Sequence, residues 1–453
     1  MEVRAVHVLQ LHPHFKIARQ VMEVLSEHEQ WSRSELTNLQ LERINQVWHH
    51  AIYHVPYYRK LLREHNLPRE FRNLDEYTSS VPILEKSTVR SGAVFSQRAN
   101  PGRWYYTGGS TGIPLAIYRE RNADLEMLSA QYRLRDLWGV GIFDRAVMEL
   151  GRADSLVPGL SGSAARLRCT IEDALRNRVR LSPYTLGRDG LRQDLRMMND
   201  FKPRFLYGHS SSIYLLALEA LETSMRLESL RLVVLTAEVI TEIIRNTTER
   251  AFPSANVVQE YGAAESLVIA SEDRQHLLRV REDIVMVETI PTEDNHYRII
   301  VSVLNNPSFP LLRYNIGDLT DRPITQTDFG FATLGSIIGR SNDFLVARSG
   351  RRVRLVAATL AAHISEHHAS VKRFRAHQFI DGRVVLYLEV DSPTEQIDTS
   401  AMERKLAAVL EGQPVEVKLV QMIPPISSGK HAWLTSELAH LDRTPDTQLR
   451  HRN

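Results

Sequence analysis

Residues 105–114 read Tyr-Tyr-Thr-Gly-Gly-Ser-Thr-Gly-Ile-Pro, a run of glycine and hydroxyl side chains that a proline closes. Glycine tolerates positive φ and close backbone approach, so such a loop can surround phosphate oxygens with N–H groups. It lacks the spacing and the lysine of a Walker A loop. By itself, this composition also suits a simple connector. Motifs further along the chain favour phosphate binding: Tyr261-Gly262-Ala263-Ala264-Glu265, Arg313-Tyr314-Asn315-Ile316-Gly317-Asp318, Gly339-Arg340 and Ser427-Ser428-Gly429-Lys430.

This ordered set resembles the adenylate-forming superfamily of acyl-CoA synthetases, peptide-synthetase adenylation domains and luciferases, and within it the phenylacetate–coenzyme A ligase and CapK-like branch. The resemblance extends from about Ser32 to the C-terminal motif. It implies an ATP- and Mg²⁺-dependent ligase that activates a carboxylic acid. It also implies two domains: residues 1–341 would bind nucleotide and acid, and residues 342–453 would form a mobile lid that carries a catalytic lysine.

Composition agrees with a multidomain globular protein. A chain of 453 residues is too long for one ordinary core, and 43% hydrophobic with 24% charged residues is typical of globular proteins. A net charge of +2 requires no nucleic-acid or membrane partner. Cys169 is the only cysteine, no apolar run reaches the length of a membrane span, and the N-terminus lacks a signal-peptide pattern. We therefore expect a cytoplasmic protein, and the sequence leaves open whether it forms a homodimer.

Short apolar strands alternate with helices over much of the chain, which predicts an α/β fold with a mainly parallel sheet. Ser32-Arg33-Ser34-Glu35 has the pattern of a capping box at the start of a helix. From Asp283 onward, strands without helices between them predict a small antiparallel β subdomain, and a small α+β lid follows Arg340. The predicted elements are helices at 121–138, 210–223, from 241 to near 253, 356–368 and 403–410, and strands at 204–207, 230–235, 256–259, 284–290, 297–304, 311–314, 374–380, 384–390 and 415–422.

The resemblance assigns a role to each motif. The loop would hold the pyrophosphate moiety of ATP, Glu265 would bind Mg²⁺, Asp318 would accept hydrogen bonds from the ribose, and Arg340 would reach ribose or phosphate. The nucleotide-binding set comprises Thr107, Gly108, Gly109, Ser110, Thr111, Gly112, Glu238, Tyr261, Gly262, Asp318 and Arg340. Tyr207, Gly208 and His209 fall where the family builds its acyl pocket, and Arg313 would be a structural support.

Lys430 would be the catalytic lysine, presented from the lid to the reacting carboxylate and phosphate, together with Glu265 and Arg340. Asn342 or Asp343 would be the hinge about which the lid turns toward a thiol. At the hinge the family usually has two aspartates, followed by a glycine–proline–glutamate pattern. In this sequence Asn342 replaces the first aspartate, and the glycine–proline–glutamate pattern is absent. The acceptor would be coenzyme A, with a carrier-protein thiol or an amine as alternatives.

Other interpretations remain open. Glu265 and Asp318 are also what a helix start and an ordinary turn contain, Lys430 suits an exposed turn, and His209 is equally a helix-capping residue. Leu115 and Ala264 replace a lysine and a threonine of the superfamily, which is consistent with a degenerate nucleotide-binding relative. His363 and His367 match a zinc-peptidase spacing, although a solvated helix explains them more simply. An aryl or arylacetic acid is the expected substrate by analogy with the branch, and a role in polysaccharide or secondary-metabolite synthesis is the alternative.

Overall fold

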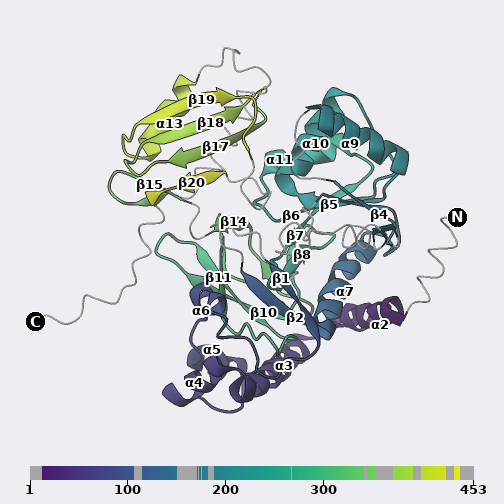
Figure 1. The fold of residues 1–453 in the computed structure, drawn as a ribbon, viewed down its shortest axis with the longest axis vertical. Coiled ribbons are helices and arrows are strands. Elements are labelled where there is room, and N and C mark those ends of the chain that lie inside the picture. Colours follow the sequence, from purple (N-terminus) through teal and green to yellow (C-terminus); the bar gives the residue numbers. More distant parts are fainter. Residues whose placement is uncertain are drawn as a thin grey trace, which may run out of the picture. The chain divides into compact units, whose positions relative to one another are not determined.

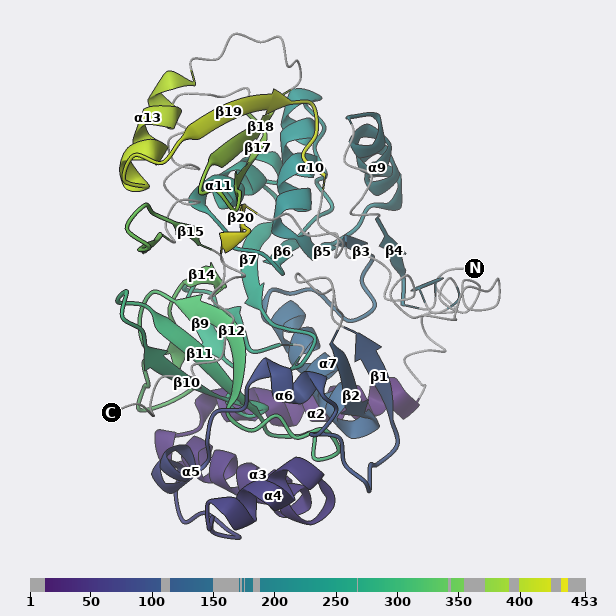
Figure 2. The same ribbon diagram turned by 60° about the vertical axis from the view of Figure 1, so that its left-hand side comes forward.

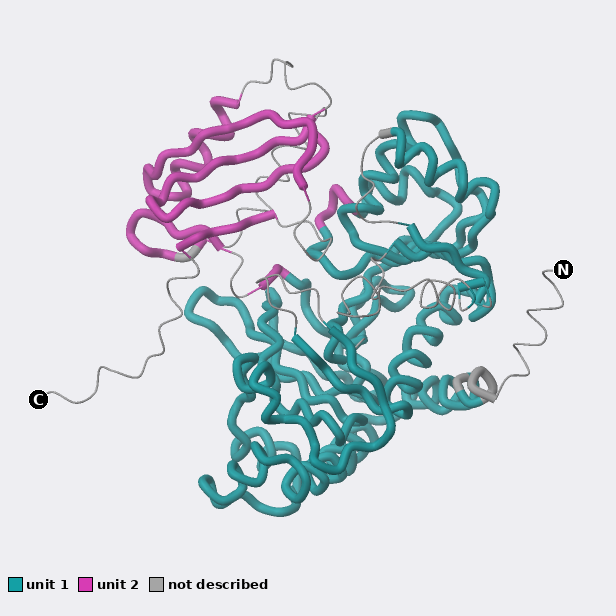
Figure 3. Tube along the Cα trace, in the orientation of Figure 1, with its two compact units in different colours: residues 1–240, 245–337, 427–429 teal, residues 241–244, 338–426, 430–453 magenta. Residues whose placement is uncertain are grey.

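The computed structural model describes residues 13–106, 115–149, 171, 173–174, 176–181, 188–266, 268–340, 344–353, 371–390, 399–424 and 433–438. The chain divides into two compact units (Figure 3). The first contains most of the chain up to Ile337 and the second begins at Ile338, with Thr241–Ile244 also assigned to the second. The sequence placed a domain boundary at 341, close to this division. The roles of nucleotide-binding domain and lid remain predictions.

The first unit is built on a large sheet with the strand order β13-β9-β8-β7-β6-β5-β3-β4. From β4 to β7 in this order neighbouring strands run parallel, whereas β8, β9 and β13 pair antiparallel. Figure 2 shows α9 and α10 on one face of this sheet and α7 on the other. The predicted mixed α/β fold with a mainly parallel sheet is confirmed. The strands are β3 (Ala146–Glu149), β4 (Arg178–Arg180), β5 (Phe205–His209), β6 (Leu232–Thr236), β7 (Asn256–Tyr261), β8 (Ala270–Glu272), β9 (Leu278–Val280) and β13 (Thr333–Leu334).

Helices surround the sheets, and α3 to α5 gather beside β10 and β11 (Figure 1). The predicted capping box is present, because Ser32 accepts from the Glu35 backbone N–H while Glu35 accepts from that of Ser32. The helices are α2 (Pro13–Glu27), a short 3₁₀ turn (His28–Gln30), α3 (Arg33–His54), α4 (Pro56–Glu64), α5 (Leu74–Ser80), α6 (Lys86–Arg90), α7 (Arg121–Leu137), α9 (Arg188–Phe201), α10 (Ser210–Glu222) and α11 (Glu242–Ala251).

Two smaller sheets complete this part of the chain. The first is the hairpin of β1 (Gly102–Tyr106) and β2 (Ala116–Glu120), and the second has the order β10-β11-β12-β14. Its strands are β10 (Val285–Pro291), β11 (Tyr297–Val303), β12 (Tyr314–Thr320) and β14 (Ile337–Arg340). The antiparallel β10–β11–β12 arrangement confirms the predicted β subdomain. The strand predicted at 311–314 is wrong in its bounds, since β12 begins at Tyr314.

The second unit holds a sheet of order β19-β18-β17-β20 with one covering helix among its described residues. Gly382 has φ +88° in the turn between β17 and β18, where the sequence predicted a tight hairpin. Leu386, Leu388, Met402 and Leu406 pack in its buried core. The elements are β15 (Leu345–Val346), β16 (Arg352–Val353), β17 (Arg373–Gln378), β18 (Val384–Glu389), α13 (Ser400–Val409), β19 (Val415–Val420) and β20 (Leu434–Ser436). The helix predicted at 356–368 lies outside the described residues.

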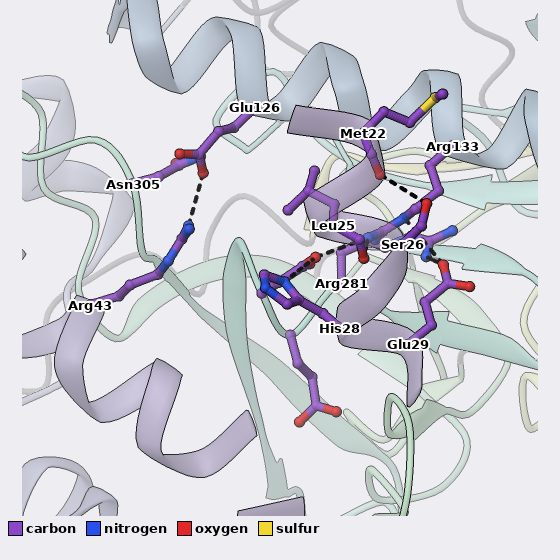
Figure 4. A network of polar contacts seen from close by, with 12 residues as sticks. Met22, Leu25, Ser26, His28, Glu29, Arg43, Glu126, Arg133, Arg281 and Asn305 are labelled. Atoms are coloured by element: carbon purple, nitrogen blue, oxygen red, sulfur yellow. Dashed lines mark hydrogen bonds and ion pairs between the residues drawn. The ribbon is translucent and has the colours of Figure 1, made fainter. Parts of the chain in front are cut away.

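A buried polar network joins three elements of the first unit (Figure 4). Arg133 of α7 lies 3.0 Å from the carboxylate of Asp283, which precedes β10 and is fully buried. His28 lies 3.3 Å from the same carboxylate. Glu29 binds Arg133 at 3.1 Å and Arg281 at 2.8 Å. The network therefore ties α2 and its 3₁₀ turn to α7 and to the β9–β10 connection.

Candidate active site

The candidate residues lie at the carboxyl edge of the parallel strands. Strand β3 ends at Glu149, β5 at His209, β6 at Thr236 and β7 at Tyr261. The ladder aligns these ends, since Gly208 pairs with Glu149 and His209 with Thr236. Ligands of open α/β sheets bind at this edge, because the chain leaves the strands there in loops. The sequence placed Tyr207, Gly208 and His209 after a strand, whereas they are the last residues of β5.

Tyr261 and Asp318 are brought together from distant segments. The phenol of Tyr261, at the end of β7, donates a hydrogen bond of 2.9 Å to Oδ2 of Asp318 in β12. A bulge presents Asp318, since Asn315 and Leu319 of β12 face Ile300 and Arg298 of β11. Gly317 sits inside this bulge with φ +87°, a backbone conformation that favours glycine. Two residues predicted to bind one nucleoside are therefore in direct contact.

Glu265 lies four residues beyond Tyr261 and is buried. Tyr314, also in β12, donates to its Oε1 at 3.1 Å, and Lys86 Nζ lies 3.6 Å from the same oxygen. Glu265 occupies a turn, and no described helix begins there, so the helix-start interpretation is wrong. Strand β12 thus contacts the segment after β7 at two points, and these contacts bring Tyr261, Glu265 and Asp318 into one neighbourhood.

Lys86 and Tyr314 are residues that sequence reasoning missed as parts of this site. The extended segment before α6 lies along β12, where Leu84 forms a parallel bridge with Tyr314. Lys86 then begins α6 with its side chain 31% exposed. A lysine five residues after Val81-Pro82 was visible in the sequence, but nothing local in it indicates a carboxylate partner at position 265.

Glu265 is also the candidate ligand for Mg²⁺. Mg²⁺ is commonly held by one or two carboxylates together with phosphate oxygens and water, so a single buried carboxylate suits it. The described residues contain no group of three histidine, cysteine, aspartate or glutamate side chains placed for a metal. A site completed by a nucleotide's phosphates therefore fits these residues better than an all-protein site.

Tyr207 points toward α7. Its phenol donates to Glu260 Oε1 at 2.6 Å, and Gln131 of α7 donates to the same oxygen at 3.1 Å. Burial raises the pKa of Glu260, and the hydrogen bonds from Tyr207 and Gln131 offset part of that effect. Tyr207 and Glu260 also line a pocket between α7 and the sheet. The predicted substrate residue Tyr207 therefore borders a real cavity.

Gly208 and His209 pack against Glu149. A Cβ at Gly208 would lie 2.6 Å from Glu149 Cβ and 2.8 Å from its carbonyl oxygen, so only glycine fits. His209 donates its backbone N–H to Glu149 Oε2 at 3.0 Å, and its ring Nδ1 lies 3.5 Å from that oxygen. Burial raises the pKa of the Glu149 carboxyl, and the contacts with His209 offset part of that rise. Both side chains are buried.

Helix α10 follows directly from this point. His209 is its N-cap residue but makes no side-chain capping bond, and Ser210 is the first helical residue. The backbone N–H of Ser211 is instead accepted by Glu238 Oε2 at 2.8 Å. This bond satisfies one of the unpaired N–H groups of the first turn. Glu238 therefore helps to position α10. Its predicted role in nucleotide binding is a separate question that this contact does not decide.

Residues 107–114, which include the predicted phosphate-binding residues of the glycine loop, lie outside the described residues. The two strands on either side of them are anchored by described contacts. Tyr106 pairs with Ala116 where β1 and β2 meet the loop. The phenol of Tyr105 donates to Asp124 at 2.6 Å, and the Arg119 guanidinium lies 3.6 Å from its ring centroid. Leu115 is buried at 1% exposure, so no polar side chain is presented from that position.

Several predicted site residues lie in the second unit or outside the residues that the structure describes. Arg340 ends β14 within the second unit. Lys430, the hinge candidates Asn342 and Asp343, and the histidines His363 and His367 lie outside the described residues. Their roles stay predictions. Arg313, expected to be a support, forms an ion pair of 2.9 Å with Glu288.

Several known proteins are similar to this chain in sequence or in fold. No family model matches the chain. Protein CapK of Staphylococcus aureus is 23% identical over 372 residues, covering 80% of each chain. Phenylacetate-coenzyme A ligase of Thermus thermophilus is 27% identical over 341 residues, covering 70% of this chain and 73% of the relative.

Among solved structures, a 2-hydroxyisobutyryl-CoA ligase in complex with 2-HIB-AMP has a TM-score of 0.70 at 17% identity, covering 91% of this chain and 92% of that one. The same ligase has also been solved with 2-HIB-AMP and CoA. The similarity at this identity concerns the fold, and the sequence relatives point to the same group. The chain therefore belongs to the adenylate-forming superfamily and is a distant homologue of CapK and of the phenylacetate–coenzyme A ligases.

Proposed function

We propose that this chain activates a carboxylic acid with ATP, forming an acyl-adenylate and pyrophosphate, and then transfers the acyl group to coenzyme A. The observation that carries this proposal is the meeting of Tyr261, Glu265 and Asp318 at the carboxyl edge of the sheet. An adenylation site needs a ribose acceptor and a carboxylate that can hold a metal beside the phosphates. These residues supply both.

In the first step a carboxylate oxygen of the acid attacks the α-phosphorus of ATP, and the bond to pyrophosphate breaks. Asp318 would accept hydrogen bonds from the ribose hydroxyls, since an ionised carboxylate is an acceptor only. Tyr261 would pack against the adenine while its phenol fixes Asp318. Glu265 would hold Mg²⁺, which when bound would neutralise charge on the departing pyrophosphate.

The phosphates also need cations from the protein. The loop from Thr107 to Gly112 would supply N–H and hydroxyl donors, and buried Leu115 supplies no charge. Lys86 has the required charge, and its Nζ lies 3.6 Å from Glu265. We therefore assign to Lys86 the phosphate contact that the loop lacks. Arg340 would add a second contact to ribose or phosphate.

The second unit would complete the reaction. Lys430 would bridge the carboxylate and the α-phosphate as negative charge develops. In the second step the thiol sulfur attacks the acyl carbon, its proton leaves, and AMP departs. The phenylacetate ligases among the relatives favour coenzyme A as the acceptor and an aryl acid as the substrate. The similarity to CapK motivates the alternative, transfer to a carrier protein or an amine.

Exchange of labelled pyrophosphate into ATP, measured over a panel of carboxylic acids, tests adenylation directly. We expect exchange that depends on one class of acid and falls at least about 100-fold in Asp318→Ala. Nucleotide binding without exchange for any acid would instead identify a degenerate binding protein, as Ala264 and Leu115 suggest. Mass spectrometry of reactions with coenzyme A or hydroxylamine would then identify the acceptor chemistry.

A further inference from the structure

The pocket beside Tyr207 lies between α7 and the edge of the large sheet formed by β5, β3 and β4. At one end Tyr207, Gln131 and Glu260 bind one another, with Gln131 Nε2 also 3.3 Å from the Tyr207 phenol. Each of these groups therefore has a partner within the protein. This end adjoins the predicted acyl site, because Tyr207 lies two residues before the carboxyl end of β5.

The other end of the pocket is cationic. Arg135 of α7, Arg176 and Arg178 all line it. Arg135 is 8% exposed, and its guanidinium lies 4.4 Å from the ring centroid of Phe205. One nitrogen, Nη2, donates to the carbonyl of Gly141 at 2.6 Å, while Nε is buried without a hydrogen bond among the described residues. Stacking on an aromatic ring fixes the guanidinium plane, as in arginines that bind carboxylates or phosphates.

Two carboxylates lie near these arginines among the described residues. Asp173 binds Arg178 and also Arg180, the latter at 2.9 Å, so two arginines share one carboxylate. The charge of Asp144 acts on Arg135 from a distance, but the Arg135 guanidinium makes its hydrogen bond to a backbone carbonyl and not to a carboxylate. Burial lowers the pKa of Arg135 to about 10, which still leaves it charged at neutral pH. A buried cation that contacts no carboxylate among the described residues is unfavourable, so an anion entering this end would be stabilised.

From this arrangement we infer that the pocket binds acids that carry a second anionic group, held by Arg135, Arg176 and Arg178, while the carboxylate to be activated lies toward Tyr207. This inference rests on the proposed function and specifies its substrate class. It departs from the aryl monoacid expected by analogy, which would bring no anionic group to the arginine end of the pocket. Arginine's planar donors suit carboxylate and phosphate oxygens alike, so a dicarboxylate and a phosphono acid share the required chemistry.

Matched acids test the inference with the full-length protein. Butyrate is compared with succinate, valerate with glutarate, benzoate with isophthalate, and 3-phosphonopropionate tests the other anion. We expect kcat/KM in pyrophosphate exchange to be about 10- to 100-fold higher for the dianionic member of at least one pair, because charge-assisted hydrogen bonds are gained. Calorimetric binding of the same acids gives a readout that needs no turnover.

Arg176→Gln is the informative variant, since Arg176 lines the pocket and is only partly buried. It should reduce the preference for the dianionic acid about tenfold, and Arg176→Lys should restore part of it. Arg196→Gln, an exposed arginine of α9, is the matched control and should leave the preference unchanged. Thermal melts check that each variant is folded.

The outcomes separate the two proposals. If monoacids support exchange and bind as well as or better than their dianionic partners, the inference is wrong and the adenylation proposal stands. If dianionic acids bind in an Arg176-dependent way without any exchange, the pocket assignment stands and the adenylation proposal is wrong. If no acid of either kind binds or supports exchange, both are overturned.

Discussion

Lys86 is the side chain to which we assign the phosphate contact that position 115 cannot make. Its Nζ lies 3.6 Å from the buried carboxylate of Glu265, and position 115, where the superfamily often has a lysine, holds a buried leucine. An ammonium on a flexible stem is a suitable phosphate contact. Its position at the start of α6, beside β12, makes it available to the same site as Asp318.

Lys86→Ala should therefore raise KM for ATP about tenfold while changing KM for the acid little, because one charge-assisted contact to phosphate is lost. Lys86→Arg should retain part of the affinity. Pyrophosphate exchange at varied ATP concentration measures the effect. Lys60→Ala removes an exposed lysine that pairs with Glu64 in its own helix, and it should behave as wild type. An unchanged KM for ATP in Lys86→Ala would remove Lys86 from the site.

At the residue scale, the sequence indicated candidate residues of the site but not their partners. Tyr261, Glu265 and Asp318 became candidates because their motifs are local and ordered along the chain, and their roles stay predictions. Tyr314 and Lys86 were missed, since their contacts with Glu265 span long separations in sequence that no local pattern encodes. The role of Glu238 in holding α10 was missed for the same reason.

Among the elements, the network of Asp283 is a link that the sequence did not reveal. Burial alone would raise the pKa of Asp283, but the charge of Arg133 and the contact with His28 outweigh it and hold the pKa well below its usual range. A depressed pKa means that the ionised form stabilises the fold. That stabilisation is complete above pH 4 or so and is lost as the pH falls further.

Asp283→Asn should lower the free energy of unfolding at pH 7 by about 3 to 5 kcal/mol, because Arg133 loses its buried counter-ion. Denaturant titrations at pH 7 and at several pH values below 4 measure the effect. The difference from wild type should persist at mildly acidic pH and shrink only as the pH falls below about 4, where the unfolded wild-type chain binds a proton at this carboxylate and the folded form does not yet do so. Asp136→Asn, on an exposed position of α7, should change stability by less than about 0.5 kcal/mol at each of these pH values. Equal losses in the two variants would contradict this account.

Local rules predicted most elements, and their failure at β12 has a physical reason. The capping box at Ser32 and the turn at Gly382 depend on nearest neighbours, so they could be read directly. The strand after Leu311 was placed too early, because Asn315 and Gly317 are typical turn residues. In the structure they form the bulge that presents Asp318 within a continuous strand.

At the scale of the whole molecule, periodicity predicted the fold class, whereas the order of strands in the sheet could not be derived from it. Sheet order depends on crossover connections between segments far apart, such as the return of β13 to pair with β9. Among the described residues no helix has the length and apolar character of a membrane span. The assignment of Lys430 to catalysis concerns both units and still depends on the resemblance.

Lys430→Ala should reduce adenylation by about 100- to 1,000-fold while ATP binding stays nearly intact, since the lysine would act on charge that develops only in the transition state. Pyrophosphate exchange and calorimetric ATP binding separate the two effects. Lys418→Ala removes an exposed lysine of β19 in the same unit and is the control. Loss of ATP binding in Lys430→Ala would show a different role.

The tight contact between Gly208 and Glu149 limits how this enzyme can be redesigned. A methyl group at position 208 would meet the main-chain carbonyl of residue 149 as well as its side chain, so trimming Glu149 would not make room. Attempts to alter substrate scope by enlarging Gly208 should therefore fail at folding. The practical route for engineering lies on the helix side of the cavity, where Leu128 can vary without forcing two strands apart.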